Sequence, residues 1–197
     1  MLSDLQLRVA RIIAGLIEAE DFALAGGAAL IVRGEVERAT RDLDFFGTSP
    51  DAVDHLVPAA ELALQQAGFQ VDRLIDSPGF TRLVVADELE RTEVDLASDA
   101  RLFPTETGPG FDLLSSEELA ADKVLAVFGR AEARDYVDRM SIEPRFGRLQ
   151  RWKCMCFDGR SGSLRRNHQL FSAACERSPG AESDGPSQPR NRHRCRR

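Results

Sequence analysis

Phe22-Ala-Leu-Ala-Gly26-Gly27-Ala-Ala-Leu-Ile-Val-Arg33 is the stretch that decides the fold of this 197-residue chain. Its first four residues predict a short buried strand, Gly26 and Gly27 predict a turn, and residues 28–33 predict the first turns of a helix packed on that strand. Glycine lets the backbone approach a ligand closely, and a helix N-terminus presents unpaired N–H groups to an anion. The stretch therefore predicts a strand, turn and helix that can receive phosphate.

A pair of carboxylates follows in Asp42-Leu43-Asp44. Side chains at i and i+2 of an extended segment point the same way, so Asp42 and Asp44 are expected to project together while Leu43 points into a core. Adjacent carboxylates repel each other in a partly dry cleft, and a divalent cation relieves that repulsion. Mg²⁺ fits best because it takes one or two carboxylates and keeps other positions for water and phosphate oxygens. The alternative is a surface Asp pair on an ordinary strand.

Arginines lie close to both features, at Arg33, Arg38 and Arg41. Guanidinium groups pair with phosphate oxygens, so these side chains can answer the negative charge of a triphosphate. The glycine turn, the carboxylate pair and the arginines together predict a binding site for a nucleoside triphosphate and its metal ion.

The remaining elements are read from apolar periodicity and turn residues. The patterns predict helices at residues 3–19, at 50–67 and from about 116 onward, and strands at 22–25, 42–46, 69–75, 80–85 and 92–96. The strands at 69–75 and 80–85 are predicted to form a hairpin across Ser77-Pro78-Gly79. The fold class is therefore α/β (α+β), with a mixed β-sheet flanked by helices.

Composition divides the chain into a domain at residues 1–147 and a basic, poorly patterned C-terminal tail, helical or irregular, at residues 148–197. Residues 1–138 contain 27 Asp or Glu and 12 Arg or Lys, whereas residues 139–197 contain 5 and 14. Phosphate contacts supply most non-specific affinity for nucleic acids, so the acidic part is a poor generic binder. An RNA partner would need a local basic rim, for which the candidates are Arg33, Arg38, Arg41, Lys123, Arg130 and Arg134.

The location predicted from the sequence is cytoplasmic. Charged residues interrupt every apolar run before it reaches the length needed to cross a bilayer, which predicts that the protein does not enter a membrane. The N-terminus, Met1-Leu-Ser-Asp-Leu-Gln6, lacks the basic start and apolar stretch of a secretory signal.

Two blocks of sequence resemble the AbiEii-like nucleotidyltransferases, which are toxins of toxin–antitoxin systems on the polymerase-β-type nucleotidyltransferase fold. The first block is Leu24-Ala-Gly-Gly-Ala-Ala-Leu-Ile-Val-Arg33 with Arg38-Ala-Thr-Arg-Asp-Leu-Asp-Phe-Phe46. The second is Ala121-Asp-Lys-Val-Leu-Ala-Val-Phe-Gly-Arg130 with Arg134-Asp-Tyr-Val-Asp138. The resemblance covers roughly residues 1–147. Where many members have Gly-Ser, this chain has Gly27-Ala28, so a hydroxyl contact to the phosphates is missing.

The resemblance implies an NTP-dependent enzyme that transfers a nucleoside monophosphate and releases pyrophosphate. It also implies Mg²⁺ as cofactor, a cognate antitoxin protein as partner and RNA as acceptor, in particular the tRNA 3′ end, with translation blocked as the result. Two other functions stay open from the residues: a nucleotidyltransferase that modifies a small molecule or a protein, and a non-catalytic binding module with this fold.

The implied site draws on both blocks. The catalytic candidates are Asp42, Asp44, Lys123 and Asp135; the nucleotide-binding candidates are Gly26, Gly27, Arg38, Thr40, Lys123, Arg130 and Arg134; the metal-binding candidates are Asp42, Asp44 and Asp95.

Several of these candidates can also be explained without a role in metal or nucleotide binding. Glu93 and Asp95 share one face of a strand, so either can complete the metal site, or both can face water. Lys123 is the sole lysine in residues 1–138, yet a single helix lysine is commonly a solvated residue. Asp135 and Asp138 lie on one side of an expected continuing helix, and either can orient Lys123 or Arg130 instead of touching metal.

Thr40 lies two residues before Asp42, on the same predicted side. A phosphate on its hydroxyl would add about −1.5 to −2 charges beside the acidic pair and occupy the place of the nucleotide, so phosphorylation would inactivate the enzyme. The alternative is a threonine present for its strand propensity.

The tail contains all four cysteines, Cys154, Cys156, Cys175 and Cys195, which offer no disulfide framework for the domain. A zinc site from Cys154, Cys156, His168 and Cys175 lacks the usual two-residue gap between its first ligands. Alternatively, this tail can be an arginine-rich arm that binds RNA.

Overall fold

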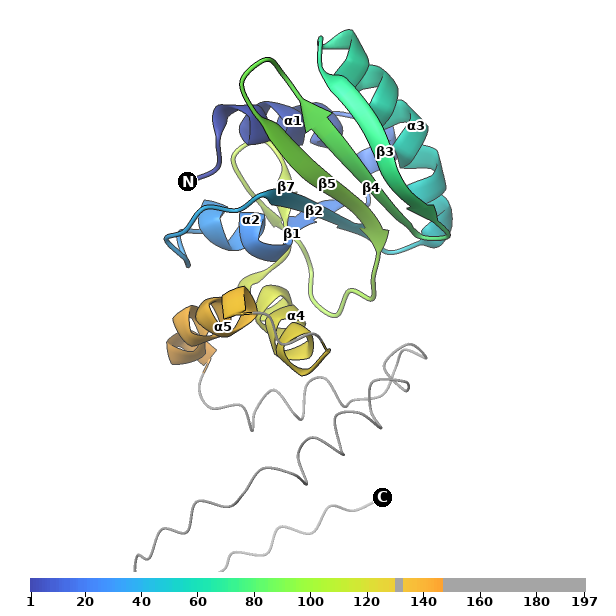
Figure 1. Cartoon of the computed structure of the whole chain (residues 1–197). Coiled ribbons are helices and arrows are strands. Elements are labelled where there is room, and N and C mark those ends of the chain that lie inside the picture. The colour runs from blue at the N-terminus through green and yellow to red at the C-terminus, as the bar shows by residue number, and fades with distance from the viewer. Residues whose placement is uncertain (130–132, 147–197) are drawn as a thin grey trace, which may run out of the picture.

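The computed structural model describes residues 1–129 and 133–146, and within them seven strands form one mixed sheet in the order β3-β4-β5-β2-β1-β7-β6 (Figure 1). The strands are β1 (Ala23–Ala25), β2 (Asp42–Gly47), β3 (Gln70–Ser77), β4 (Phe80–Ala86), β5 (Arg91–Ser98), β6 (Glu106–Thr107) and β7 (Asp112–Leu113). The pairs β2–β5 and β1–β7 are parallel, and the other neighbours are antiparallel. The predicted mixed sheet with flanking helices is confirmed.

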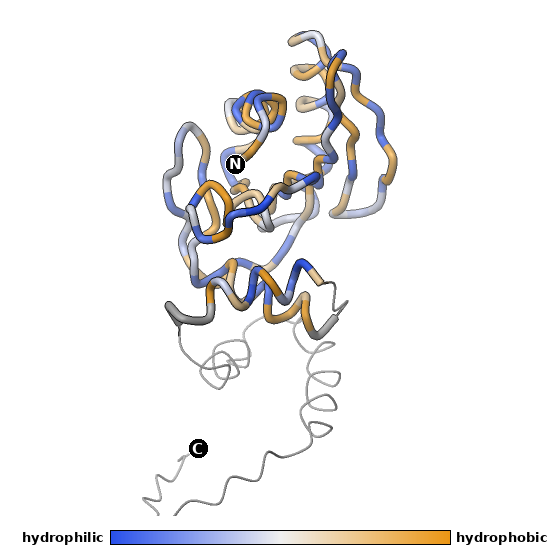
Figure 2. Tube along the Cα trace, turned by 60° about the vertical axis from the view of Figure 1, so that its left-hand side comes forward, coloured by the Kyte–Doolittle hydropathy of each residue, from blue (hydrophilic) through white to orange (hydrophobic). Residues whose placement is uncertain are grey.

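Helices cover the sheet from both sides. They are α1 (Asp4–Ala14), α2 (Gly26–Val32), α3 (Pro50–Gln66), α4 (Ser116–Gly129) and α5 (Ala133–Phe146), with a 3₁₀ turn, η1, at Ile17–Ala19. In Figure 1, α4 and α5 lie below the sheet and α1 and α3 lie on its other side. In Figure 2, hydrophobic and hydrophilic stretches follow one another along the helices that lie below the sheet.

The core lies where α1 and α3 pack on the central strands. Along β2, Leu43 and Phe45 are buried against these helices, while Asp42 and Asp44 face the opposite side. The alternation that the sequence predicts for Asp42-Leu43-Asp44 is therefore present, and it turns both carboxylates toward α4.

Three predicted boundaries differ from the structure. The helix expected at residues 3–19 ends at Ala14, where the Gly15 amide donates to the Arg11 carbonyl and the Leu16 amide donates to the Ile13 carbonyl, and Ile17–Ala19 forms a separate turn. The helix expected to continue into Asp138 is two helices, since α4 ends at Gly129 and α5 begins at Ala133. The helix after β1 begins at Gly26, so the expected glycine turn is already its first turn.

Strands β6 and β7 were not predicted. Each has two residues, which is too short for an alternating pattern to be visible in the sequence. They extend the sheet beyond β1, where Leu113 pairs with Leu24. No helix in the described part of the chain has both the length and the apolar character needed to span a membrane.

Candidate active site

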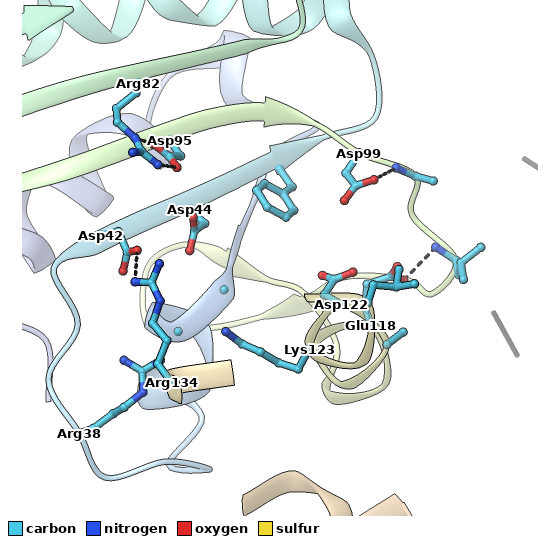
Figure 3. A pocket seen from close by; sticks show the side chains of 17 residues that line it. Arg38, Asp42, Asp44, Arg82, Asp95, Asp99, Glu118, Asp122, Lys123 and Arg134 are labelled. Atoms are coloured by element: carbon cyan, nitrogen blue, oxygen red, sulfur yellow. Dashed lines mark hydrogen bonds and ion pairs between the residues drawn. The ribbon is translucent and has the colours of Figure 1, made fainter. Parts of the chain in front are cut away.

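A cavity of about 340 Å³ lies between the sheet at β2 and β5 and the helices α4 and α5 (Figure 3). Most sequence-predicted site residues reach it. It is lined by Gly26, Gly27, Arg38, Asp42, Asp44, Phe46, Arg82, Asp95, Asp99, Ala100, Leu102, Glu118, Ala121, Asp122, Lys123, Leu125 and Arg134. Its volume is at the lower end of the range for small-molecule sites, roughly 300–1,000 Å³.

The Asp pair forms the floor of this cavity. Asp42 and Asp44 occupy alternate positions of β2, and Asp44 lies directly beside Asp95 of the parallel strand β5. Burial raises the pKa of Asp42, but the Thr40 hydroxyl, which donates to its Oδ1, and the nearby Arg134 outweigh burial and bring that pKa below its usual value. Asp42 is therefore ionised at neutral pH, as a metal ligand must be.

Gly26 and Gly27 are required because other side chains approach their backbone closely. Gly26 has a φ of +59°, in the left-handed region, and a Cβ there would lie 1.8 Å from Asp44 Oδ2. A Cβ on Gly27 would lie 2.5 Å from Arg38 Nη2. Any side chain at either position would displace a carboxylate or a guanidinium group, so the backbone of this turn lines the cavity directly.

Arginines neutralise two of the candidate metal ligands. Arg134 Nη1 lies 3.0 Å from Asp42 Oδ2, and the guanidinium of Arg82 donates to both oxygens of Asp95 at 2.6 Å. Arg82 and Asp95 are direct cross-strand partners on β4 and β5. Among the described residues no group of three or more Asp, Glu, His or Cys is arranged to hold a metal ion.

A buried ion-pair network holds Lys123 of the second block and Arg38 of the first. Lys123 Nζ lies 2.8 Å from Asp138 Oδ2 and 3.3 Å from Asp135 Oδ1, and both carboxylates have fully buried side chains. Arg38 donates to both oxygens of Asp138 at 2.7 Å, across 100 residues of sequence. Asp135 and Asp138 do not line the cavity. Both aspartates thus contact Lys123, as in one of the alternatives left open by the sequence, and Asp138 also contacts Arg38.

Other candidates lie elsewhere. Arg33 pairs with Glu35 and Glu106 on the far side of α2, and neither Arg33 nor Arg41 lines the cavity. Thr40 contacts Asp42 from the cavity edge, on the side that the sequence predicted. Arg130 and the tail at residues 148–197, including the cysteines, lie outside the described residues.

Sequence reasoning missed the acidic side of the cavity. Glu118, Ala121, Asp122 and Leu125 follow the i, i+3, i+4, i+7 spacing of one helical face, and this face of α4 borders the cavity. Asp99 faces them from the residue after β5. This α4 face mixes acidic and apolar residues. Such a mixture is typical of neither a core face nor a solvent face, so the sequence pattern did not indicate a cavity.

Asp122 has a strongly perturbed carboxyl group. Burial, and then the negative charges of Asp99 and Glu118, raise its pKa to about 8. Glu118 is itself only 3% exposed and accepts hydrogen bonds from the amides of Leu102 and Phe103, which ties the segment after β5 to α4. Asp122 is therefore mostly neutral at pH 7 in the free protein.

The Asp122 pKa predicts a pH-dependent stability difference. The unfolded carboxyl loses its proton near pH 4 and the folded one near pH 8, so folding is progressively penalised between these values. Asp122→Asn removes this penalty, and its free energy of unfolding should gain on the wild type by on the order of 1 kcal/mol per pH unit from about 4 to 8. Urea titrations of both proteins without metal at pH 5, 6, 7 and 8 measure it; a constant difference would contradict the shift.

Comparisons with solved structures identify the fold class. The chain is similar to JHP933 from Helicobacter pylori, with 21% identity and a TM-score of 0.54 over 74% of this chain and 69% of that one. It is also similar to an antigenic nucleotidyltransferase-like protein from Paracoccidioides brasiliensis, with 17% identity and a TM-score of 0.50 over 89% and 94%. The likeness shows that the chain shares the fold of these two proteins, a mixed β-sheet flanked by helices.

The family follows from the sequence itself. Residues 10–140 match the model of the nucleotidyl transferase AbiEii toxin family of type IV toxin–antitoxin systems, and the chain belongs to that family. The resemblance seen in the two sequence blocks is confirmed, as is the enzyme class, a nucleotidyltransferase. The family also implies a nucleotide substrate and an antitoxin partner. No curated protein sequence matches the chain.

Proposed function

We propose that this enzyme is a Mg²⁺-dependent toxin that transfers a nucleoside monophosphate from an NTP to RNA, at the 3′ end of tRNA, and so blocks translation. The observation that supports it is the cavity in which Asp42 and Asp44 face Arg38, Lys123 and Arg134. Paired carboxylates suit a metal ion, and the surrounding cations suit the phosphates that the metal ion brings.

The residues present fit a divalent cation, which enzymes of this family generally use. Asp42 and Asp44 offer carboxylate oxygens from one face of β2, and the lack of a side chain at Gly26 lets the Asp44 carboxylate approach the backbone there. Asp95 is proposed as the third ligand, which requires Arg82 to release it. When bound, Mg²⁺ would neutralise charge on the phosphates and lower the pKa of the acceptor hydroxyl.

The cationic side chains are proposed to bind the triphosphate. Arg134 reaches into the cavity to Asp42, and a metal ion at Asp42 would free its guanidinium for a phosphate. Lys123 is proposed to contact the phosphates as a point charge, oriented by Asp135 and Asp138. Arg38, placed by Asp138, is proposed to act beside it. Asp135 acts through Lys123 because its side chain is fully buried.

The proposed reaction is an in-line displacement. The acceptor hydroxyl oxygen forms a bond to the α-phosphorus while the bond from that phosphorus to the bridging α–β oxygen breaks, and pyrophosphate leaves. The hydroxyl proton is lost to solvent or to a carboxylate of the floor. Catalysis of this kind is mainly placement and charge stabilisation, which the fixed cation network provides.

The proposal is tested by incubating the protein with each α-labelled NTP, Mg²⁺ and total RNA. We expect label to appear in RNA of tRNA size, to be removed by enzymes that trim 3′ ends, and to be absent when EDTA replaces Mg²⁺. Label in protein or in small molecules instead would favour the other nucleotidyltransferase class, and no transfer with any acceptor would contradict an active enzyme. Action in the cytoplasm and inactivation by phosphate on Thr40 stay predictions; intact-mass analysis after co-expression with the antitoxin tests the latter.

A further inference from the structure

The cavity has two ends of unlike character. Figure 3 shows Arg38, Arg82 and Arg134 on one side and Glu118 and Asp122 on the other. Apolar side chains line the cavity as well, namely Phe46, Ala100, Leu102, Ala121 and Leu125. A ligand with a highly charged anionic part and a neutral, partly apolar part therefore has one favourable orientation in this cavity.

Strand β2 sets the spacing between the two ends. Asp42, Asp44 and Phe46 occupy alternate positions and all three line the cavity. Two residues of a strand span about 7 Å, so Phe46 lies about that far along β2 from the Asp44 position. This offset suits a ribose and base attached to a phosphate that is held at the carboxylate pair.

The α4 face and the segment after β5 form the walls of this second end. Ala121 and Leu125 come from α4, and Leu102 comes from the segment whose amide hydrogen bonds attach it to Glu118. Leu102 is 45% exposed and lines the cavity, so its side chain is accessible to a ligand bound there. Its attachment through the buried Glu118 gives this wall a defined position before any ligand arrives.

We propose that the end of the cavity formed by Phe46, Leu102, Asp122 and Leu125 is the nucleoside subsite, in which the base of the incoming NTP packs on Phe46. The proposal rests on the proposed function and deepens it by assigning the orientation of the NTP. It gives Asp122 and its neighbours a role that the metal and phosphate site leaves unexplained.

The charge of the lining residues favours the nucleoside of the NTP over the RNA acceptor as the ligand at this end of the cavity. Asp99, Glu118 and Asp122 place carboxyl groups at this end, and these groups offer no positive charge to the phosphates of an RNA strand. A nucleoside is neutral, and its N–H and O–H donors match carboxyl oxygens. Aromatic side chains bind bases by stacking without strong sequence preference, which fits Phe46.

The experiment compares nucleotide with inorganic triphosphate as calorimetric ligands, both with Mg²⁺ and the full-length protein. The wild type should bind ATP or CTP at least about tenfold more tightly than triphosphate, because only the nucleotides fill the second end. Phe46→Ala should weaken nucleotide binding about tenfold, the usual loss for one stacking contact, and leave triphosphate binding unchanged. Leu102→Ala should act in the same direction by about fivefold.

Leu89→Ala is the matched control, since Leu89 is 94% exposed in the turn between β4 and β5 and does not line the cavity. It should bind both ligands as the wild type does. Because Phe46 packs against the core, thermal unfolding of its variant checks folding, and Leu102→Ala tests the same subsite without that risk.

The outcomes separate the two proposals. Failure of both ligands to bind the wild type would overturn the proposed function. Binding of both with equal affinity, or nucleotide affinity unchanged in Phe46→Ala and Leu102→Ala, would overturn the nucleoside subsite alone. A raised KM for RNA with unchanged nucleotide affinity would assign this end of the cavity to the acceptor.

Discussion

Asp42→Ala and Asp44→Ala are each expected to lower nucleotide transfer by at least about a thousandfold, to below detection in a labelled-NTP assay. The reason is that each variant removes half of the carboxylate pair that would bind the metal ion, and metal-ion charge supplies several kcal/mol of stabilisation in such reactions. Calorimetry with Mg²⁺ and NTP should show the matching loss of metal uptake. Folding should persist, because both side chains border the cavity rather than the core.

Asp72→Ala is the control for these variants. Asp72 is an exposed aspartate on the edge strand β3, away from the cavity, so transfer and metal uptake should equal those of the wild type. Retained transfer in Asp42→Ala or Asp44→Ala, with normal folding, would show that the metal ion is held elsewhere.

Asp138→Asn is expected to lower the free energy of unfolding by about 3 kcal/mol and to weaken NTP binding as well. The side chain is fully buried and faces both Lys123 and Arg38, so losing its charge leaves these cations uncompensated. The figure is at the lower end for a broken buried pair because Arg38 is 22% exposed. Urea unfolding at pH 7 and calorimetry with NTP provide the two measurements.

The stability difference between the wild type and Asp138→Asn is expected to depend on pH. Burial raises the pKa of Asp138, but hydrogen bonds from Arg38 and Lys123 outweigh burial and bring the pKa below its usual value. The contribution of Asp138 to stability is therefore complete above the unfolded pKa, near 4, and is lost as the pH falls below that value. The wild type and Asp138→Asn should converge in stability toward low pH.

Asp76→Asn is the control for Asp138→Asn. Asp76 also pairs with an arginine, Arg73, but its side chain is 60% exposed, and exposed pairs contribute little to stability. Its unfolding curve should superimpose on that of the wild type. An equal loss of unfolding free energy in Asp76→Asn and Asp138→Asn would mean that burial of the ion-pair network does not add to its contribution to stability.

The sequence was sufficient for features that depend on neighbouring residues. The Asp42 and Asp44 side chains share a face because they are two apart on a strand, and the helix at Pro50 begins where serine and proline indicate it. The glycine turn was also foreseen, since few other residues tolerate the left-handed conformation of Gly26.

Features that depend on tertiary contacts were not available from one sequence. Arg82 meets Asp95 because β4 and β5 pair in a particular register, which composition does not define. Arg33 and Arg38 looked equivalent, yet the end of α2 directs Arg33 to Glu106 and leaves Arg38 for Asp138. The strands β6 and β7 were too short to leave a periodic signal.

The contact between Arg38 and Asp138 also bears on how the toxin is made. Helix α5 is the last described element of the chain, and it supplies Arg134 to the cavity and the aspartates that orient Lys123. A ribosome-bound chain that has exposed only the sheet and α4 lacks these groups. The nascent polypeptide is therefore expected to lack transferase activity until α5 has emerged and docked.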